Sequence, residues 1–265
     1  MHLDTNVADL GHAEKAPSRP KPPAPRPQRP LKLRRPAWYA RGKRALDVAA
    51  ALALLALAGP VMLLAALLVK LTSRGPAFYS QTRLGLHGRP FTLYKIRSMH
   101  HDCERHSGPR WCRPGDPRVM PLGRFLRKTH LDELPQLWNV LRGEMSLIGP
   151  RPERPEFVPQ LERAVPRYRD RLLVAPGLTG LAQVQLPPDS DLESVRVKLA
   201  YDLWYVQRHG LGMDLRIAVA TAFHLAGLRR HLLRWLLLVP EQADIEQEYW
   251  ALADEPAPAP CAQTA

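Results

Sequence analysis

Cysteine and acidic residues are scarce in this chain of 265 residues. The three cysteines, Cys103, Cys112 and Cys261, form no regular framework, which argues against a disulfide-built fold and indicates a reducing compartment. The sequence has no internal repeat and no glycine-rich phosphate loop of the Walker type, which excludes a repeat array and a P-loop site. Only 25 Asp and Glu stand against 38 Lys and Arg, so the net charge of +13 predicts an anionic partner: phosphate groups, acidic lipid or nucleic acid.

The N-terminal segment has no acidic residue between Lys15 and Arg44, a stretch with eleven Lys or Arg and eight prolines. Such a composition cannot bury a core, so residues 1–40 are predicted to form a disordered cationic tail. The tail is consistent with a solvated linker or with attraction to the anionic lipids of a membrane surface. Residues 241–265 are predicted to be a second, C-terminal tail.

One hydrophobic run, residues 48–69, contains 22 residues and no charge. As a helix it would be about 33 Å long, enough to cross the hydrocarbon core of a bilayer. Gly59 and Pro60 lie near its midpoint, where the proline predicts a kink. Both flanks are basic, and positive charge marks the cytoplasmic side. A helix that bends and returns to the same face of the membrane places both basic flanks on the cytoplasmic side, whereas a straight span places only one there. The predicted membrane segment, with its flanks, is residues 41–75.

The first part of the run also suggests a local ion pair. Lys43 and Asp47 are four residues apart, the spacing at which opposite charges meet on a helix. We therefore expect them to pair just before the hydrophobic residues begin.

Residues 76–240 are predicted to form a cytosolic domain. Two alternating runs, Phe78–Arg83 and Phe91–Arg97, flank glycines and predict a β-hairpin. Helical patterns follow at Leu131–Leu141, Pro155–Arg171, Leu192–His209 and Asp214–Leu238. The last pattern is basic and amphipathic, typical of a helix that lies in a membrane interface or covers a core. The expected fold class is an α-rich α+β domain with a membrane helix, a short hairpin and interfacial amphipathic helices.

Residues 100–112 gather three histidines and two cysteines. Their spacing matches no standard set of zinc ligands, so this segment is interpreted as a polar loop.

Two adjacent acids, Asp132 and Glu133, stand in a basic part of the chain. Thr129 is a possible helix N-cap with Asp132 three residues later, as in a capping box. Alternatively, Asp132 is itself the cap, which places Pro135 in the first turn. Either arrangement puts both acids at a helix N-terminus, where the helix dipole favours negative charge.

The basic neighbours of this pair suggest chemistry as well as capping. Arg127 and Lys128 precede the acids and Arg151 follows them, and such cations at a helix start form a phosphate site. Of two adjacent carboxylates, one can attack phosphorus while the other holds Mg²⁺ or Mn²⁺ to neutralise the phosphates. The nearby membrane segment suggests that one phosphate belongs to a lipid.

These residues carry a resemblance to a known family. From about residue 43 to residue 226 the chain resembles the bacterial sugar transferase family, the small monotopic phosphoglycosyl transferases that act on polyprenyl phosphate. The motifs are KRALD (43–47), the Gly59-Pro60 break, FTLYKIRSM (91–99), DPR (116–118), LDELPQLWNVLRGEMSLIGPRP (131–152), PGLTGLAQV (176–184) and YDLWYV (201–206). The long central motif is highly specific.

The resemblance implies a re-entrant helix broken at the proline, in one leaflet of the bacterial inner membrane, with the active site on the cytoplasmic face. It implies that Asp132 is the nucleophile and that Glu133 serves the metal. The remaining site residues implied by the motifs are the phosphate-binding Arg127, Arg151 and Lys95, and the nucleotide-sugar-binding Gly177, Thr179, Gly180 and Gln183.

The function implied is transfer of a sugar-1-phosphate from a UDP-sugar to polyprenyl (undecaprenyl) phosphate, with release of UMP and a covalent aspartyl-phosphosugar intermediate. Such a product begins a surface glycan, and a homodimer is a possible assembly. The alternative is a basic, membrane-tethered binding or scaffold protein without catalysis. No basic stripe interleaved with aromatics and no recognition-helix pattern occurs, so nucleic acid is not expected as a partner.

Overall fold

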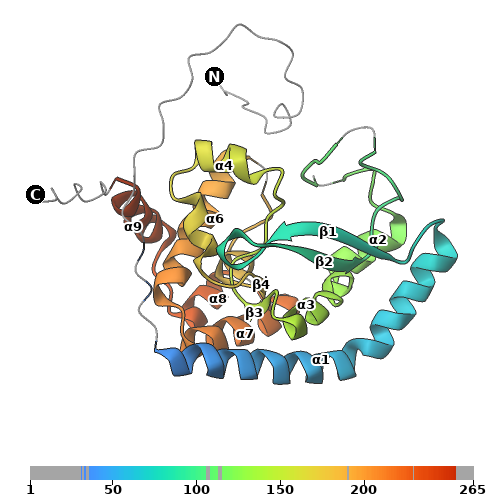
Figure 1. Cartoon of the computed structure of the whole chain (residues 1–265), viewed down its shortest axis with the longest axis horizontal. Helices are drawn as coiled ribbons and strands as arrows, with labels where there is room; N and C mark the ends of the chain where they lie inside the picture. The colour runs from blue at the N-terminus through green and yellow to red at the C-terminus, as the bar shows by residue number, and fades with distance from the viewer. Residues whose placement is uncertain are drawn as a thin grey trace, which may run out of the picture.

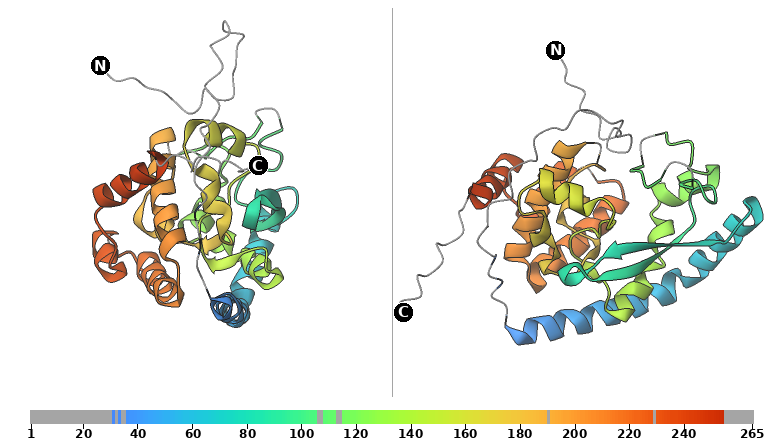
Figure 2. Two further views of the ribbon diagram at one scale, coloured as in Figure 1. Left: turned by 60° about the vertical axis from the view of Figure 1, so that its left-hand side comes forward. Right: turned by 45° about the horizontal axis from the view of Figure 1, so that its top comes forward.

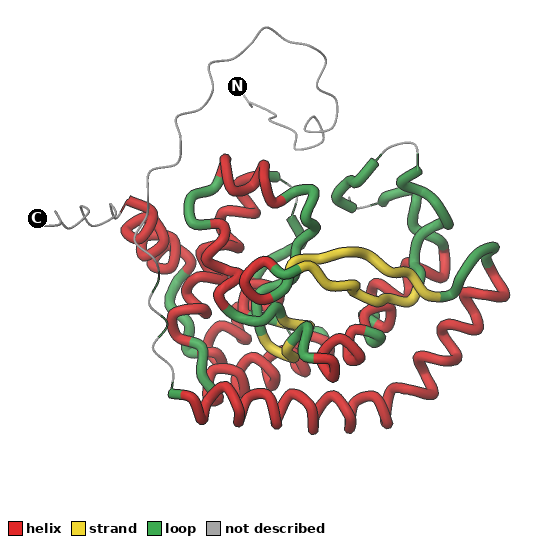
Figure 3. Tube along the Cα trace, in the orientation of Figure 1, coloured by secondary structure: helices red, strands yellow, loops and turns green. Residues whose placement is uncertain are grey.

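The computed structural model describes residues 31, 33, 36–105, 108–112, 115–189, 191–228 and 230–254. Most of the cationic tail predicted for residues 1–40 therefore lies outside the described residues. Helices dominate the described part, and two short pairs of strands lie in its middle (Figure 3).

The hydrophobic run forms part of α1, Ala37–Thr72, one helix of 36 residues that contains Pro60. Figure 1 shows α1 passing along the base of the domain and bending upward in its second half. The predicted kink is thus a bend within a single helix. Within the described residues α1 alone is long and apolar enough to cross a membrane, and 17% of its most apolar 18-residue window is buried.

Polar contacts fasten the first half of α1 to the domain. Lys43 forms an ion pair with Asp214 (Nζ–Oδ2 2.8 Å), and the Asp47 carboxylate accepts a hydrogen bond from the main-chain N–H of Leu147 (3.1 Å). The predicted pair between Lys43 and Asp47 is therefore wrong. Each side chain finds a partner far away in the sequence, because this face of α1 packs against the domain.

The predicted hairpin is confirmed. Strands β1, Phe78–Leu84, and β2, Pro90–Ile96, pair antiparallel, with Phe78 opposite Ile96. They are joined by the short helix η2, Leu86–Gly88. Figure 2 shows the hairpin running alongside the second half of α1, and Ile96 shares a small core with Ala65 and Val69 of that helix.

The Asp-Glu pair lies in a broken helical segment. Helix α2, Pro121–Lys128, is followed by the 3₁₀ turn η3, Leu131–Glu133, and by α3, Gln136–Arg142. Thr129 ends α2: its hydroxyl donates to the carbonyls of Phe125 (2.9 Å) and Leu126 (3.2 Å), so the predicted N-cap role is wrong.

The middle of the domain is less helical than the pattern predicts. Strands β3, Ser146–Ile148, and β4, Gly177–Thr179, pair in parallel. Between them lie α4, Val158–Ala164, and the 3₁₀ helix η4, Tyr168–Leu173, so the helix predicted over 155–171 is interrupted. Arg167 has φ 61° at the interruption, a left-handed conformation that ends helical hydrogen bonding.

The C-terminal third is helical. The elements are α5 (Leu181–Gln185), α6 (Leu192–Arg208), α7 (Leu211–Leu225), α8 (Arg230–Leu237) and α9 (Gln242–Asp254). The helix predicted over 192–209 is confirmed as α6, and a capping box at Asp191 begins it. The helix predicted over 214–238 is split into α7 and α8, with Gly227 at φ 89° between them.

The C-terminal segment is not wholly a tail. In α9, Ile245 and Tyr249 are 1% and 2% exposed. They belong to the main hydrophobic core, to which α6 contributes many side chains. The hydroxyl of Tyr249 donates to the carbonyl of Pro166 (3.1 Å). The tail prediction for residues 241–254 is therefore corrected, because this helix has an apolar face to bury.

A second set of apolar side chains is exposed instead of buried. It lies on α1, α7 and α8, and includes Leu57 (78%), Leu215 (66%) and Trp235 (80%). Figure 1 places these three helices along the base of the molecule. Exposed apolar side chains in such number are typical of a surface that meets a membrane or a partner.

Candidate active site

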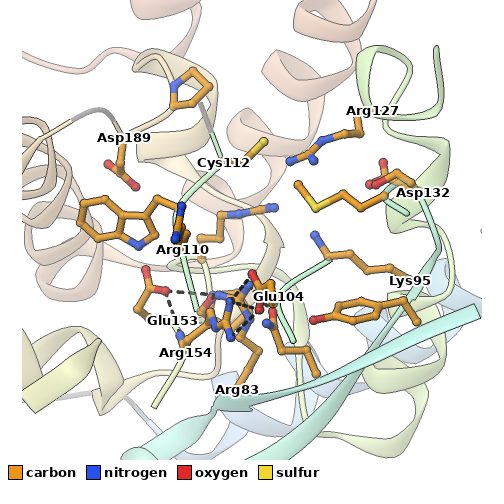
Figure 4. Close-up of a pocket in the computed structure, with 18 of the residues that line it drawn as sticks. Arg83, Lys95, Glu104, Arg110, Cys112, Arg127, Asp132, Glu153, Arg154 and Asp189 are labelled. Carbon is orange, nitrogen blue, oxygen red and sulfur yellow. Dashed lines mark hydrogen bonds and ion pairs between the residues drawn. The ribbon is translucent and has the colours of Figure 1, made fainter. Parts of the chain in front are cut away.

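A cavity of about 730 Å³ opens between the hairpin, residues 98–105 and 110–112, residues 151–154 and α6. Figure 4 shows side chains of the hairpin, of residues 104, 110 and 112 and of residues 153–154 converging on it. The lining is predominantly basic. Ten Lys or Arg (83, 95, 97, 105, 110, 127, 151, 154, 171 and 198) line it with six Asp or Glu (102, 104, 132, 153, 189 and 202). The cavity therefore favours an anionic ligand.

Asp132 lies on one wall of this cavity, and Lys95 and Arg127 lie beside it (Figure 4). The 3₁₀ turn places the residue where only 5% of it is exposed. The local turn begins at His130, whose left-handed φ of 57° turns the chain away from α2. Asp132 accepts no hydrogen bond within the described part of the chain.

The electrostatics of Asp132 differ from those of a helix cap. Burial raises the pKa of its carboxyl, and the nearby charges of Lys95, Arg127 and Arg151 oppose this shift. A buried carboxylate without a hydrogen-bond partner, facing cations across a cavity, is available to react with a ligand.

Glu133 is not among the residues that line the cavity. Its carboxylate accepts from Lys95 (Nζ–Oε1 2.7 Å) and from both terminal nitrogens of Arg151 (Nη2–Oε1 2.5 Å, Nη1–Oε2 3.1 Å). Burial acts to raise the pKa of Glu133, but the charges of Arg151 and Lys95 outweigh it and hold this pKa well below its usual value. Glu133 thus anchors two cavity-lining cations.

The two acids fit a Mg²⁺ or Mn²⁺ ion in part. Mg²⁺ commonly binds through one or two carboxylates and completes its shell with water and substrate phosphates. Asp132 has free oxygens, but those of Glu133 are engaged by Lys95 and Arg151. Metal binding by Glu133 therefore requires at least one of these cations to turn toward the substrate phosphates.

The predicted nucleotide-sugar residues separate into two groups. Gln183 lines the cavity. Gly177 and Gly180 do not; a Cβ at Gly177 would lie 2.1 Å from the main-chain nitrogen of Gly149, and one at Gly180 would lie 2.2 Å from its oxygen. These glycines permit close packing of β3, β4 and α5. Thr179 also lies outside the lining, and its hydroxyl pairs with that of Thr221 on α7 (3.0 Å).

Several cavity residues were missed from the sequence. Arg154 holds Glu104 of the loop through three contacts of 3.0 Å, so this loop is tied across the cavity. The loop also contributes Cys103 and Cys112 to the lining. Arg154 lies two residues after the GPRP of the long motif, which was the available signal, whereas nothing in the sequence relates it to Glu104.

A second missed pair is Arg171 with Asp202 (Nη2–Oδ2 2.6 Å), both cavity-lining. The YDLWYV motif contains Asp202, but no role for this residue followed from that motif. Arg171 lay at the end of the helix predicted over 155–171 and carried no signal.

Comparison with known proteins agrees with the motifs. The model of the bacterial sugar transferase family matches residues 38–227. A UDP-glucose:undecaprenyl-phosphate glucose-1-phosphate transferase of Caulobacter vibrioides is 48% identical over 68% of this chain and 67% of its own length. A UDP-N-acetylgalactosamine-undecaprenyl-phosphate N-acetylgalactosaminephosphotransferase of Aeromonas hydrophila is 43% identical over 69% of this chain. The match spans 43% of the length of that second relative.

Proposed function

Because the chain belongs to the bacterial sugar transferase family, we propose that it transfers a sugar-1-phosphate from a UDP-sugar to polyprenyl (undecaprenyl) phosphate and releases UMP. The names of the two relatives state this type of reaction for those proteins. The observation that carries the proposal is the buried carboxylate of Asp132, without a hydrogen bond, on the wall of a basic cavity. A scaffold protein needs no such group, so the scaffold alternative is not favoured.

The chemistry proceeds in two steps. An oxygen of Asp132 attacks the β-phosphorus of the UDP-sugar, and the bond from that phosphorus to the bridging oxygen breaks. UMP leaves with the bridging oxygen, and an aspartyl-phosphosugar remains. An oxygen of polyprenyl phosphate then attacks the same phosphorus, which breaks the acyl-phosphate bond and regenerates the carboxylate. The products are UMP and polyprenyl-diphospho-sugar.

The cations around Asp132 stabilise the charge that develops on the transferring group. Lys95, Arg127 and Arg151 line the cavity together with the nucleophile. Prearranged charges lower the barrier because they require no reorganisation at the moment of reaction. In this arrangement Glu133 orients Lys95 and Arg151 through its ion pairs.

A Mg²⁺ or Mn²⁺ ion, when bound, supplies further neutralisation of the diphosphate charge. Asp132 would hold it, since carboxylate oxygen is the donor that these hard cations prefer, and Glu133 would join it once Lys95 or Arg151 turned to the substrate phosphates. Gln183, at the cavity wall, is assigned to the nucleotide-sugar together with the arginines of the lining.

The lipid acceptor is proposed to approach along the exposed apolar base. The bend of α1 supports a re-entrant helix in one leaflet of the inner membrane, with α7 and α8 in the interface and the site on the cytoplasmic face. The excess of basic residues supports attraction to anionic lipids. The product is suited to begin a surface glycan; one relative, from Rhizobium leguminosarum, is named an exopolysaccharide production protein.

Isotope exchange tests the first step. Purified wild-type protein in lipid nanodiscs free of polyprenyl phosphate should exchange labelled UMP into a UDP-sugar, because UMP leaves before the acceptor reacts. Asp132→Asn keeps the shape but is a far poorer nucleophile, so it should lose exchange and turnover. Asp116→Asn, which lies outside the cavity lining, is the matched control and should retain both. Substantial exchange by Asp132→Asn would disprove the covalent mechanism, and a panel of UDP-sugars identifies the donor.

A further inference from the structure

The ion pair between Arg171 and Asp202 has no role in the chemistry described so far. It joins η4 to α6, with Nη2 of Arg171 2.6 Å from Oδ2 of Asp202. The side chains are 10% and 5% exposed, and both line the cavity. A buried ion pair seldom stabilises a fold more than apolar residues of similar volume would. Stability alone therefore does not explain why this pair lines the cavity.

The guanidinium of Arg171 connects three parts of the site. Besides the ion pair, Nη2 donates to the main-chain carbonyl of Arg151 (2.9 Å), and Nη1 donates to the hydroxyl of Tyr168 (2.8 Å). A guanidinium is planar and its donors are fixed in a fork. The charge of Asp202, close to Nη2, therefore helps to hold the guanidinium where it donates to Arg151.

The position of Arg151 depends on the hydrogen bond that its main-chain carbonyl accepts from Arg171. Its side chain is 44% exposed, so packing does little to hold it. Its guanidinium binds Glu133, and its main chain is held by Arg171 on one side and by the adjacent bond from Gly177 N–H to the Pro150 carbonyl (2.8 Å) on the other. A shift of the main chain at Arg151 would move its guanidinium relative to Asp132.

We propose that Arg171 and Asp202 are positioning residues of the active site, which hold the main chain of Arg151 so that its guanidinium meets Glu133 and the transferring phosphate. The inference rests on the proposed function and adds to it a positioning role for Arg171 and Asp202. They act through Arg151, since the terminal nitrogens of Arg171 are already engaged by Asp202, Tyr168 and the Arg151 carbonyl.

The first test compares two substitutions that each remove the carboxylate of an ion pair with arginine. Asp202→Asn weakens the orientation of Arg171. Asp170→Asn is the matched control, because Asp170 lies next to Arg171 in η4 and pairs with Arg167 (2.8 Å) but does not line the cavity. Asp202→Asn should lower kcat for UMP exchange about 10- to 100-fold, as expected for a misplaced group, with a small change in KM for the UDP-sugar. Asp170→Asn should keep kcat while it lowers the melting temperature.

A double-mutant cycle separates positioning from general damage. If Asp202 acts through Arg151, then Asp202→Asn should cost much less in an Arg151→Lys protein than in the wild type. If the loss in kcat of the double variant equals the product of the losses of the two single variants, to within about twofold, the two residues act independently. That result would overturn the inference. Equal kcat losses in the Asp202 and Asp170 variants, or none in either, would overturn it as well. Absence of exchange by the wild type would instead refute the proposed function, and this inference with it.

Discussion

Glu133 anchors two cations, so replacing it with the neutral amide of glutamine should weaken the fold as well as the reaction. Glu133 and Lys95 are 12% and 19% exposed, and removing one partner of a buried pair costs about 3–5 kcal/mol. Arg151 is 44% exposed, so its pair adds only about 0–1 kcal/mol. The glutamine oxygen still accepts one hydrogen bond, which returns about 1 kcal/mol. The free energy of unfolding should therefore fall by about 3 kcal/mol.

A loss of this size corresponds to a melting temperature lower by about 6–12 °C for a domain of this length. Thermal unfolding of the protein in lipid nanodiscs, followed by tryptophan fluorescence, measures it. Glu248→Gln is the matched control: Glu248 pairs with Arg208 on the surface, with side chains 42% and 40% exposed, and should shift the free energy by less than about 1 kcal/mol.

The pH dependence gives a second check on the same reasoning. The pKa of Glu133 is held well below 4.5, so its stabilisation is present above pH 4.5 and is lost as the pH falls toward the folded-state pKa. The difference between the wild type and Glu133→Gln should be constant from pH 7 to about pH 5 and should shrink below pH 4.5. A Glu133→Gln protein as stable as the wild type at pH 7 would refute the anchoring role.

Three other predictions concern the nucleophile, the metal and the membrane helix. Burial raises the pKa of Asp132, so its ionised form destabilises the fold at neutral pH; Asp132→Asn should raise the melting temperature, and a lower one would contradict the burial argument. The same shift means that exchange by the wild type should decline as the pH falls toward this pKa. EDTA should abolish turnover and Mg²⁺ should restore it; turnover that persists in EDTA would exclude the metal. Cysteines placed near positions 40 and 74 should both be labelled from the cytoplasmic side alone, and Pro60→Leu should expose one of them to the opposite side.

Patterns within a few residues of one another predicted much of the fold. The uncharged run at 48–69 became α1, and the alternating runs around Gly85 and Gly88 became the hairpin. A helix pattern depends on residues three or four positions apart, and a strand pattern on residues two positions apart. Both patterns can therefore be recognised in the sequence alone. The motif around Asp132 was similarly complete, because Asp132 and Glu133 are adjacent in the chain.

Long-range partners were not predictable in this way. Lys43 pairs with Asp214, 171 residues away, instead of with Asp47 on its own helix. Glu104 binds Arg154 across the cavity, although the loop around it showed only an irregular set of histidines and cysteines. Each charge had several possible partners of opposite sign, and packing of distant segments selected among them. The residue types at the site could therefore be predicted from the sequence. Their division into a free carboxylate, Asp132, and an anchored one, Glu133, arises because the folded domain brings Lys95 and Arg151 into contact with Glu133.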